Sequence, residues 1–293
     1  MAVWLPARVP TIRIALSLVL LFALTSNGAL LEAADKSAAT LLVKDALTSP
    51  NQPATIEAKL IGKGLLTSTA LGGEPLELVI DGNVVATAMT GGDGRAFLTH
   101  TPKSQGIKPI HVRVGKSPRV NQIEGKANLG VWEKRQPILM IELSSLMDIS
   151  PPSRVPAIGP RVESKGTPMS EAADELEKLT RFYYRVIYVV PLAQGMDGFQ
   201  ASREAREWLE THKFPVGHVM PLSSDAKALG DKIDELHEAG WKTVKIGIGR
   251  SKAFAEAFLQ RRLDAIMVPE PTKGDVPRKA KVAKDWKDVR KKL

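Results

Sequence analysis

The chain has 293 residues, which suits one large domain or two modest ones. It is 43% hydrophobic and 25% charged, and this composition excludes collagen-like, coiled-coil and wholly disordered proteins. Residues 272–293 carry nine basic and three acidic side chains, so they supply +6 of the net charge of +9. Because the rest of the chain is nearly neutral, we expect no nucleic-acid partner.

Cysteine is absent, which excludes disulfides, thiolate nucleophiles, iron–sulfur clusters and cysteine-ligated zinc. The five histidines show no metal-site spacing such as HExxH. The sequence therefore predicts no metal site and no cofactor.

The amino-terminal segment has the layout of an export signal. Residues 14–24 (IALSLVLLFAL) are apolar at ten of eleven positions, follow Arg8 and Arg13, and precede a small and polar stretch. This pattern predicts a signal peptide within residues 1–34, with the mature chain starting at about residues 28–36. An uncleaved amino-terminal anchor is the alternative. Both interpretations place the protein outside the cytoplasm, in a bacterial periplasm or at the cell surface.

Residues 39–133 have the texture of short strands and turns. LELVI (76–80) leads through Asp81 and Gly82 into VVATAMT (84–90), which predicts a hairpin. About seven strands at a spacing of roughly 8–12 residues predict a β-sandwich. The run GGEPLELVIDGNVVATAMTGGDGRAFLTH resembles bacterial immunoglobulin-like domains. That resemblance implies a spacer or an adhesion module.

Residues 136–270 alternate strand and helix patterns. Apolar runs at 137–143, 184–190, 243–249 and 263–269 alternate with helical patterns at 170–182, 201–212, 225–240 and 252–262, in which Ser170 and Gly240 are expected caps. The alternation predicts an α/β three-layer sandwich with a mainly parallel sheet that contains residues 137–143, 184–190 and 243–248. A functional crevice is expected beyond the carboxyl ends of these strands.

The order of ILMIELSSL, YYRVIYVVPLAQ, AREWLETHKFPVGHVMPL and VKIGIGRSKAFAEAF is similar to the haloacid dehalogenase-like (HAD) superfamily. Within it, these motifs resemble the lipin-type phosphatidate phosphatases and their bacterial relatives. The resemblance covers residues 136–270. It implies an aspartate nucleophile, an aspartate acid/base two residues later, and Mg²⁺ held by carboxylates.

The residues at the family's functional positions do not fit this chemistry. The nucleophile position holds Glu142, the acid/base position Ser144 and the phosphate-binding position Val190, while Arg250 and Phe254 occupy the metal-binding acidic positions. The family lysine has two candidates, Lys227 and Lys232. We therefore expect a catalytically silent, pseudo-phosphatase domain; an unrelated α/β domain would show the same losses.

Two local features allow binding without catalysis. Arg250, Ser251 and Lys252 at an expected helix start are candidates for an anion site. In the basic tail, residues 271–293, Val282, Trp286, Val289 and Leu293 form one apolar stripe at helical spacing. That stripe either docks on the α/β domain or lies on an anionic membrane surface.

These features together predict an exported, non-catalytic protein that acts by binding an unknown protein or envelope ligand, or as a structural component of the cell envelope. One alternative is an active Mg²⁺-dependent phosphatase or phosphatidate phosphatase. A second is an envelope adhesion module in which the sandwich binds.

Overall fold

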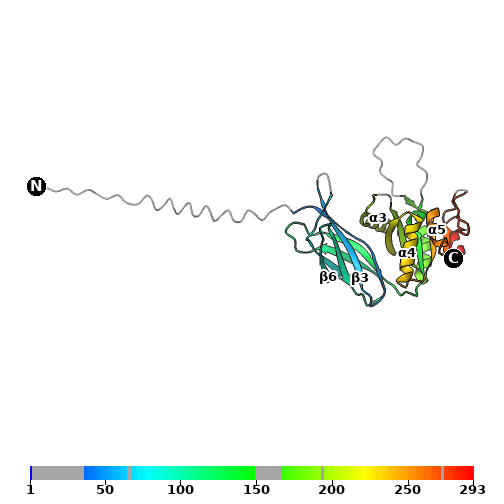
Figure 1. Ribbon diagram of the computed structural model, residues 1–293, viewed down its shortest axis with the longest axis horizontal. Helices are drawn as coiled ribbons and strands as arrows, with labels where there is room; N and C mark the ends of the chain where they lie inside the picture. The colour runs from blue at the N-terminus through cyan, green and yellow to red at the C-terminus, as the bar shows by residue number, and fades with distance from the viewer. Residues whose placement is uncertain (2–35, 65–67, 149–165, 193–194, 272–273) are drawn as a thin grey trace, which may run out of the picture.

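The structure is a computed structural model that describes residues 1, 36–64, 68–148, 166–192, 195–271 and 274–293. The predicted signal peptide or anchor lies, apart from Met1, outside the described residues. In the described part of the chain, no helix combines the length and the apolar character needed to cross a membrane. Figure 1 shows two folded parts side by side, a strand-rich one and a helix-containing one.

The first part is a β-sandwich. Its strands in the described residues are β1 (Ala39–Val43), β2 (Ala46–Thr48), β3 (Ala54–Lys63), β4 (Ser68–Ala70), β5 (Pro75–Ile80), β6 (Asn83–Met89), β7 (Arg95–His100), β8 (Gly106–Val114) and β9 (Glu124–Val131). One sheet contains β1, β3, β4 and β7, and the other has the order β2-β9-β8-β5-β6. β1, β3 and β7 thus oppose β5, β8 and β9, as the ABE and CFG strands of immunoglobulin-like sandwiches do.

Alternating side chains build the core between these sheets. In β3, Ile56, Ala58 and Leu60 are fully buried, whereas the residues between them are exposed or half-buried. This period of two gives one face to the core and one to solvent. The predicted hairpin is confirmed, because β5 and β6 pair antiparallel around Asp81 (φ 51°) and Gly82 (φ 79°), the positive angles of a tight turn.

The second part is an α/β domain with a parallel sheet. Its strands in that sheet are β10 (Ile138–Glu142), β13 (Arg185–Leu192), β14 (His218–Ser223), β15 (Val244–Gly249), β16 (Asp264–Met267) and β17 (Lys281–Val282). The sheet order is β14-β13-β10-β15-β16-β17. β10 pairs in parallel with both β13 and β15, which confirms that the three predicted strands share one parallel sheet.

Helices cover both faces of this sheet. They are α2 (Ala172–Phe182), α3 (Gly198–Thr211), α4 (Ala226–Glu238), α5 (Lys252–Leu259) and α6 (Trp286–Lys292). α2, α3 and α6 contribute side chains to one apolar core, and α4 and α5 to the other. The domain therefore has three layers. Between β10 and α2 lie a short 3₁₀ helix, η1 (Leu143–Leu146), and the paired strands β11 (Met147–Asp148) and β12 (Thr167–Pro168).

The basic tail is a part of the α/β domain and does not stand apart from it. β17 extends the sheet beside β16, and Trp286 and Val289 on α6 are fully buried in the core. The Trp286 indole N–H donates to the carbonyl of Ser145 at 3.0 Å. Of the two expectations for the apolar stripe, docking on the domain is the one observed. Docking is favourable because it removes the apolar surface of these side chains from water.

Two expected helix ends have different outcomes. Ser170 does not cap α2; the N-cap is Glu171, which has φ 62° and no side-chain cap bond, because the chain enters this helix through a left-handed turn. Gly240 does follow the end of α4 with φ 94°, and its N–H donates to the carbonyl of His237 at 3.0 Å. This is the left-handed geometry that favours glycine after a helix.

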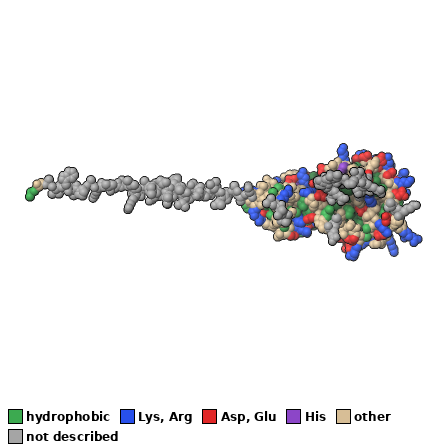
Figure 2. Space-filling view, turned by 90° about the horizontal axis from the view of Figure 1, so that it is seen from above, with side chains coloured by type: hydrophobic (Ala, Val, Ile, Leu, Met, Phe, Trp, Pro, Cys, Tyr) green, Lys and Arg blue, Asp and Glu red, His purple; other side chains and the backbone are tan. Residues whose placement is uncertain are grey.

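The two parts share a core where the chain passes between them. Trp132, just after β9, is fully buried together with Ile138 and Trp241, and Leu47 and Ile107 of the sandwich pack against the same cluster. On the face that Figure 2 shows, acidic and basic side chains are interspersed. The shared core means that the sandwich and the α/β domain are packed together rather than loosely tethered.

Candidate functional site

The predicted crevice lies where β10 and β15 end. The chain places β13 and β14 on one side of β10 and then returns to place β15 on the other, so the carboxyl ends of β10 and β15 meet at the topological switch point. Ligands of open α/β sheets bind at such a point. Glu142 is the last residue of β10, and Gly249 the last of β15.

The Glu142 carboxylate fills this point itself. It is 5% exposed, and its Oε2 accepts hydrogen bonds from the backbone N–H groups of Arg250 (2.7 Å) and Ser251 (2.8 Å). Ser251 is the N-cap of α5, and its Oγ accepts from the N–H of Phe254 at 3.2 Å. A helix amino terminus attracts negative charge, and here the protein supplies that charge from its own strand. The predicted anion site is therefore already occupied by a side chain.

Gly249 allows this close approach. A Cβ atom at this position would lie 2.4 Å from the Phe254 ring and 2.9 Å from Glu142 Oε2. Real Cβ contacts are essentially never below 3.0 Å. Gly249 is thus required by the packing of Glu142 and Phe254.

Arg250 points toward the β11 loop. Its Nη2 donates to the carbonyl of Met147 at 2.6 Å. Burial lowers the pKa of the Arg250 guanidinium, an effect that the charges of Asp148 and Glu142 oppose. Among the described residues its buried Nε has no hydrogen-bond partner. The side chain thus holds a loop, and it is not presented to a ligand at the helix start.

The other family positions are structural. Ser144 lies in η1, whereas the neighbouring Ser145 is fully buried and donates from its Oγ to the carbonyl of Glu142 at 2.7 Å. Val190 belongs to the apolar core. Phe254 is 4% exposed and its ring centroid lies 5.3 Å from that of Phe258. None of these three side chains supplies a phosphate-binding or acidic group.

The lysines predicted near the crevice lie on helix surfaces. Lys227, Lys232 and Lys252 form ion pairs one turn along their own helices, at 3.2, 2.7 and 4.0 Å, with Asp231, Glu235 and Glu256 respectively. The crevice itself is lined by Glu142, Val189, Pro191, Ser223, Ser224, Asp225, Leu229, Ser251 and Phe254. The lysine assignment is therefore not supported by the geometry.

Sequence reasoning missed Asp225, the second carboxylate that lines the crevice. Its side chain accepts from the Ser223 hydroxyl (2.5 Å) and from the N–H of Ala228 (2.6 Å), and these hydrogen bonds lower the pKa of the carboxyl group. An aspartate just before a helix is a capping signal, and Asp225 is the N-cap of α4. That pattern could have placed it, although not in the crevice.

The crevice has almost no free volume. It encloses about 10 Å³, whereas a single water needs roughly 10–15 Å³ and small-molecule pockets have roughly 300–1,000 Å³. The family's Mg²⁺ does not fit either, because Glu142 Oε2 and Asp225 already accept N–H and O–H donors from the protein. In the described part of the chain, no three His, Asp or Glu side chains are grouped as metal ligands would be. The geometry of the crevice therefore supports no phosphoryl-transfer step.

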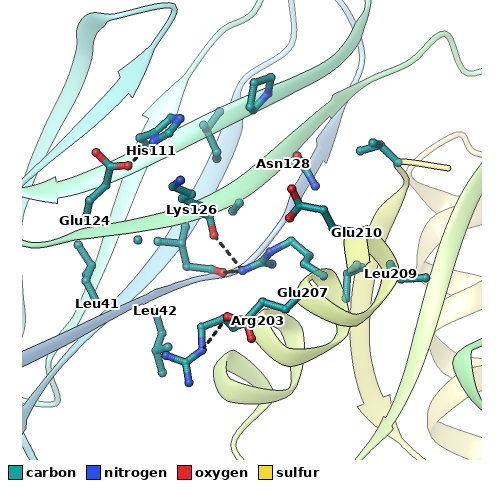
Figure 3. A pocket seen from close by; sticks show the side chains of 18 of the residues that line it. Leu41, Leu42, His111, Glu124, Lys126, Asn128, Arg203, Glu207, Leu209 and Glu210 are labelled. Carbon is teal, nitrogen blue, oxygen red and sulfur yellow. Dashed lines mark hydrogen bonds and ion pairs between the residues drawn. The ribbon is translucent and has the colours of Figure 1, made fainter. Parts of the chain in front are cut away.

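A larger cavity lies between the two domains. It has a volume of about 750 Å³ and runs between β1 and β9 of the sandwich and α3 of the α/β domain (Figure 3). Glu124, Lys126, Arg203, Glu207 and Glu210 bring charges of both signs to it (Figure 3). The mixed charge does not single out one class of ligand.

An ion pair with a buried carboxylate lies beside this cavity, which its arginine, Arg206, helps to line. The Asp45 side chain is 0% exposed, and its Oδ1 accepts from Arg206 Nη1 at 2.9 Å. Arg206 Nη2 donates to the carbonyls of Val43 (2.8 Å) and Lys126 (2.9 Å). These contacts join α3 to β9 and to the β1–β2 connection.

Backbone N–H groups of both domains also donate hydrogen bonds to the Asp45 carboxylate. Oδ1 also accepts from the N–H of Asn128 in β9 (2.9 Å), and Oδ2 accepts from the N–H of Val219 in β14 (2.8 Å). Both carboxylate oxygens of Asp45 and both terminal nitrogens of Arg206 therefore have a hydrogen-bond partner. A buried charge is tolerated under this condition. We call Asp45, Arg206 and these bonds the interdomain joint.

A second contact lies at the start of α3. The Phe199 ring is 1% exposed, and Lys44 Nζ lies 4.4 Å from its centroid. Lys59 Nζ, 5.8 Å from the same centroid, pairs with Asp197 at 2.6 Å. Burial raises the pKa of Asp197, but the hydrogen bonds from Lys59 and the Phe199 N–H, with the charges of Lys59 and Lys44, together lower it by more. The net shift of the Asp197 pKa is therefore downward. The first turn of α3 is thus docked on β3 by charge and by cation–π attraction.

Comparisons with known proteins bear only on the sandwich. No protein-family model matches the chain, and no curated protein matches it. Solved structures with similar folds include titin domain M7 (15% identity, 33% of this chain and 96% of that chain, TM-score 0.24), the D00-D0 domain of intimin (16%, 35% and 50%, 0.23) and domains 4 and 5 of the S-layer protein SbsC (14%, 33% and 54%, 0.22). At these TM-scores the likeness carries no argument, so the immunoglobulin-like description rests on the strand order of the sandwich.

Proposed function

We propose that this chain is a non-catalytic, exported protein that acts as a binding or structural module of the cell envelope, with an immunoglobulin-like sandwich followed by a silent HAD-like domain. One observation carries the proposal. The Glu142 carboxylate, in the position where the resembling family has its nucleophile, is bound to two backbone N–H groups and sealed in a crevice of about 10 Å³. A phosphate ester has no space beside it.

The HAD-like assignment is part of this proposal. It is supported by the motif order in the sequence and by a parallel sheet whose central strand, β10, ends at Glu142. In phosphoryl transfer, positioning and charge neutralisation provide nearly all of the rate enhancement. A domain that lacks a free nucleophile, an acid and a metal carboxylate loses those contributions together.

The first prediction concerns activity. The purified mature protein should release phosphate from p-nitrophenyl phosphate and from phosphatidate no faster than buffer with Mg²⁺ alone. A Glu142→Gln variant is the matched control, because it removes the carboxylate and keeps the shape of the side chain. Turnover that is clear in the wild type and lost in this variant would instead establish the active phosphatase.

A structural role is favoured by the interdomain joint. Because the buried Asp45 side chain accepts hydrogen bonds from groups of both domains, one of them the half-buried Arg206, the sandwich and the α/β domain should keep one fixed orientation. A module that holds a fixed shape suits a spacer in the envelope better than two domains on a free linker. The adhesion alternative would be favoured if the isolated protein bound a surface ligand through the sandwich alone.

A further inference from the structure

β6 leaves one edge of the five-stranded sheet open. Among the described residues it pairs with β5 and ends the strand order. In Figure 1 it lies on the side of the sandwich that faces away from the helices of the α/β domain. An open edge presents backbone N–H and C=O groups that can pair with another strand.

The edge lacks two of the features that usually prevent such pairing, a charged residue and a proline. No charged residue or proline stands between Asp81 and Asp93. Val84 (46%), Val85 (36%) and Met89 (60%) are exposed large apolar side chains. Natural edge strands are usually protected by lysine, proline or inward charges, so an uncharged, apolar edge calls for a partner.

The direction of the free backbone groups follows from the neighbouring strands. The N–H of Gly115 donates to the carbonyl of Pro75 at 2.8 Å, so the Pro75 C=O group points toward β8. Because the direction of these groups alternates along a strand, the N–H and C=O groups of Leu76 and Leu78 point toward β6.

The same alternation applies to β6 itself. Leu76 and Leu78 lie opposite Ala88 and Ala86, so the N–H and C=O groups of these alanines point toward β5 and pair with it. Thr87 and Met89 therefore direct their N–H and C=O groups outward. A register shift in the ladder with β5 falls before Ala86, which confines the regular open edge to residues 86–89.

We propose that this edge pairs with the same edge of a second copy of the chain, antiparallel, with Ala88 on the twofold axis. Thr87 of each copy then faces Met89 of the other, and the outward groups of both residues form four hydrogen bonds across the axis. The two five-stranded sheets become one continuous sheet. The interface is isologous, which is the commonest symmetry of soluble oligomers.

The edge is complementary to itself, which favours a second copy over another protein. In this register small Ala88 meets Ala88, the exposed Thr87 and Met89 side chains meet each other, and no like charges face one another within the paired residues. The proposal does not depend on the silent crevice, because β6 lies in the sandwich. Loss of one proposal would leave the other standing.

The decisive experiment measures mass against concentration by light scattering. The wild type should approach twice the chain mass as concentration rises. Thr87→Pro should stay at the monomer mass, because proline removes an outward N–H and is tolerated at a strand edge on its open side. Thr87→Ser keeps that N–H and should dimerise like the wild type. A wild type that stays monomeric up to its solubility limit would overturn the proposal, as would a Thr87→Pro protein that is folded and dimeric.

A second variant, Thr87→Lys, separates a loss of pairing from a folding defect in the proline variant. It keeps every backbone bond within the chain and adds the charge that protected edges carry. Circular dichroism and unfolding midpoints should match the wild type, while the mass falls to that of the monomer. A dimer that persists in this folded variant would count against pairing through β6.

Cross-linking tests the register, since the chain has no cysteine. Hydrogen-bonded antiparallel residues have Cα atoms about 5.5 Å apart, within the usual disulfide range of about 4.4–6.8 Å. A mixture of the Thr87→Cys and Met89→Cys proteins should form a disulfide-linked heterodimer on mild oxidation. The matched control is a mixture of the Thr99→Cys and Met89→Cys proteins, because Thr99 is exposed on β7, away from the proposed interface. Equal cross-linking in the control mixture would refute the register.

Discussion

Two of the buried carboxylates among the described residues, Glu142 and Asp45, accept hydrogen bonds from backbone N–H groups, and they do different things. Glu142 lies at the carboxyl end of β10 and is held by two N–H groups of one helix start within its own domain. Asp45 lies between the domains and is held by a guanidinium and by N–H groups from a strand of each domain. The first closes a site, and the second fixes an orientation.

This difference shows what a buried charge can be used for. The Glu142 carboxylate ties the end of β10 to the start of α5, so its bonds act within one domain and do not restrain the other. A carboxylate that accepts hydrogen bonds from groups of two domains, with an arginine among them, loses several of those bonds at once if the domains move apart. The following predictions test whether these two roles are separate.

The largest effect is expected at the interdomain joint. Asp45→Ala removes the carboxylate from the half-buried Arg206, which keeps its bonds to the carbonyls of Val43 and Lys126. Breaking a buried pair costs about 3–5 kcal/mol, which is the upper limit for this substitution. Urea unfolding of the whole chain should show that loss, and small-angle scattering should show a broader range of shapes. Lys227→Ala, which removes an exposed ion pair, should change stability by no more than about 0.5 kcal/mol. Equal effects of the two substitutions would show that the joint is not a special contact.

A smaller loss is expected at the crevice. Glu142→Gln keeps the shape but replaces a charged acceptor, whose hydrogen bonds contribute about 1.5–3 kcal/mol. The urea midpoint should fall, while the scattering profile should stay that of the wild type because the interdomain joint is untouched. In Glu142→Ala, added phosphate should raise the melting temperature by occupying the vacated helix start. If phosphate stabilises the wild type by as much, the site is not filled by Glu142.

The smallest effect concerns pH. His218 begins β14 beside the joint, and its buried Nδ1 has no hydrogen-bond partner among the described residues. Burial lowers the pKa of His218 from 6.5, helped by Lys232 and Arg206 and opposed by Asp45. The folded state thus disfavours the protonated ring, so its contribution to stability is complete above pH 6.5 and falls as the pH drops below that value.

Unfolding free energies measured between about pH 8 and pH 5 check this sign. His218→Gln, which cannot titrate in this range, should lose stability less steeply on acidification than the wild type. Identical slopes in the two proteins would mean that His218 does not couple protonation to the interdomain packing.

Much of the fold could be predicted from periodicity and turn chemistry. Asp81 and Gly82 between alternating apolar runs predicted the β5–β6 hairpin, and the apolar run of residues 137–143 predicted a strand buried on both faces. These signals are local, because a strand's burial pattern and a turn's φ angles depend on adjacent residues. The basic tail was harder, since its apolar stripe fits both docking and membrane contact until a core is present to receive Trp286.

The site was predictable only in part. The motif order identified Glu142, Arg250, Ser251 and Phe254 as residues of one place, and three of them do line the crevice. The sequence did not indicate that Glu142 would fill the helix start, because its partners follow more than 100 residues later. The interdomain joint could not be predicted: Arg206 belongs to the motif AREWLETHKFPVGHVMPL, but the motif indicates no partner for it, and no pattern singles out Asp45.

The sequence by itself determined the main strands and helices, that the first part is a sandwich and the second a parallel α/β sheet, and that no aspartate stands at the positions that the HAD-like resemblance assigns to the nucleophile, the acid and the metal ligands. Tertiary structure alone decided that the crevice is sealed, that the tail belongs to the core, and that Asp45 and Arg206 lock the domains together. The physical reason is range: secondary structure follows from neighbouring residues, whereas the burial of a charge depends on which distant donors the fold brings to it.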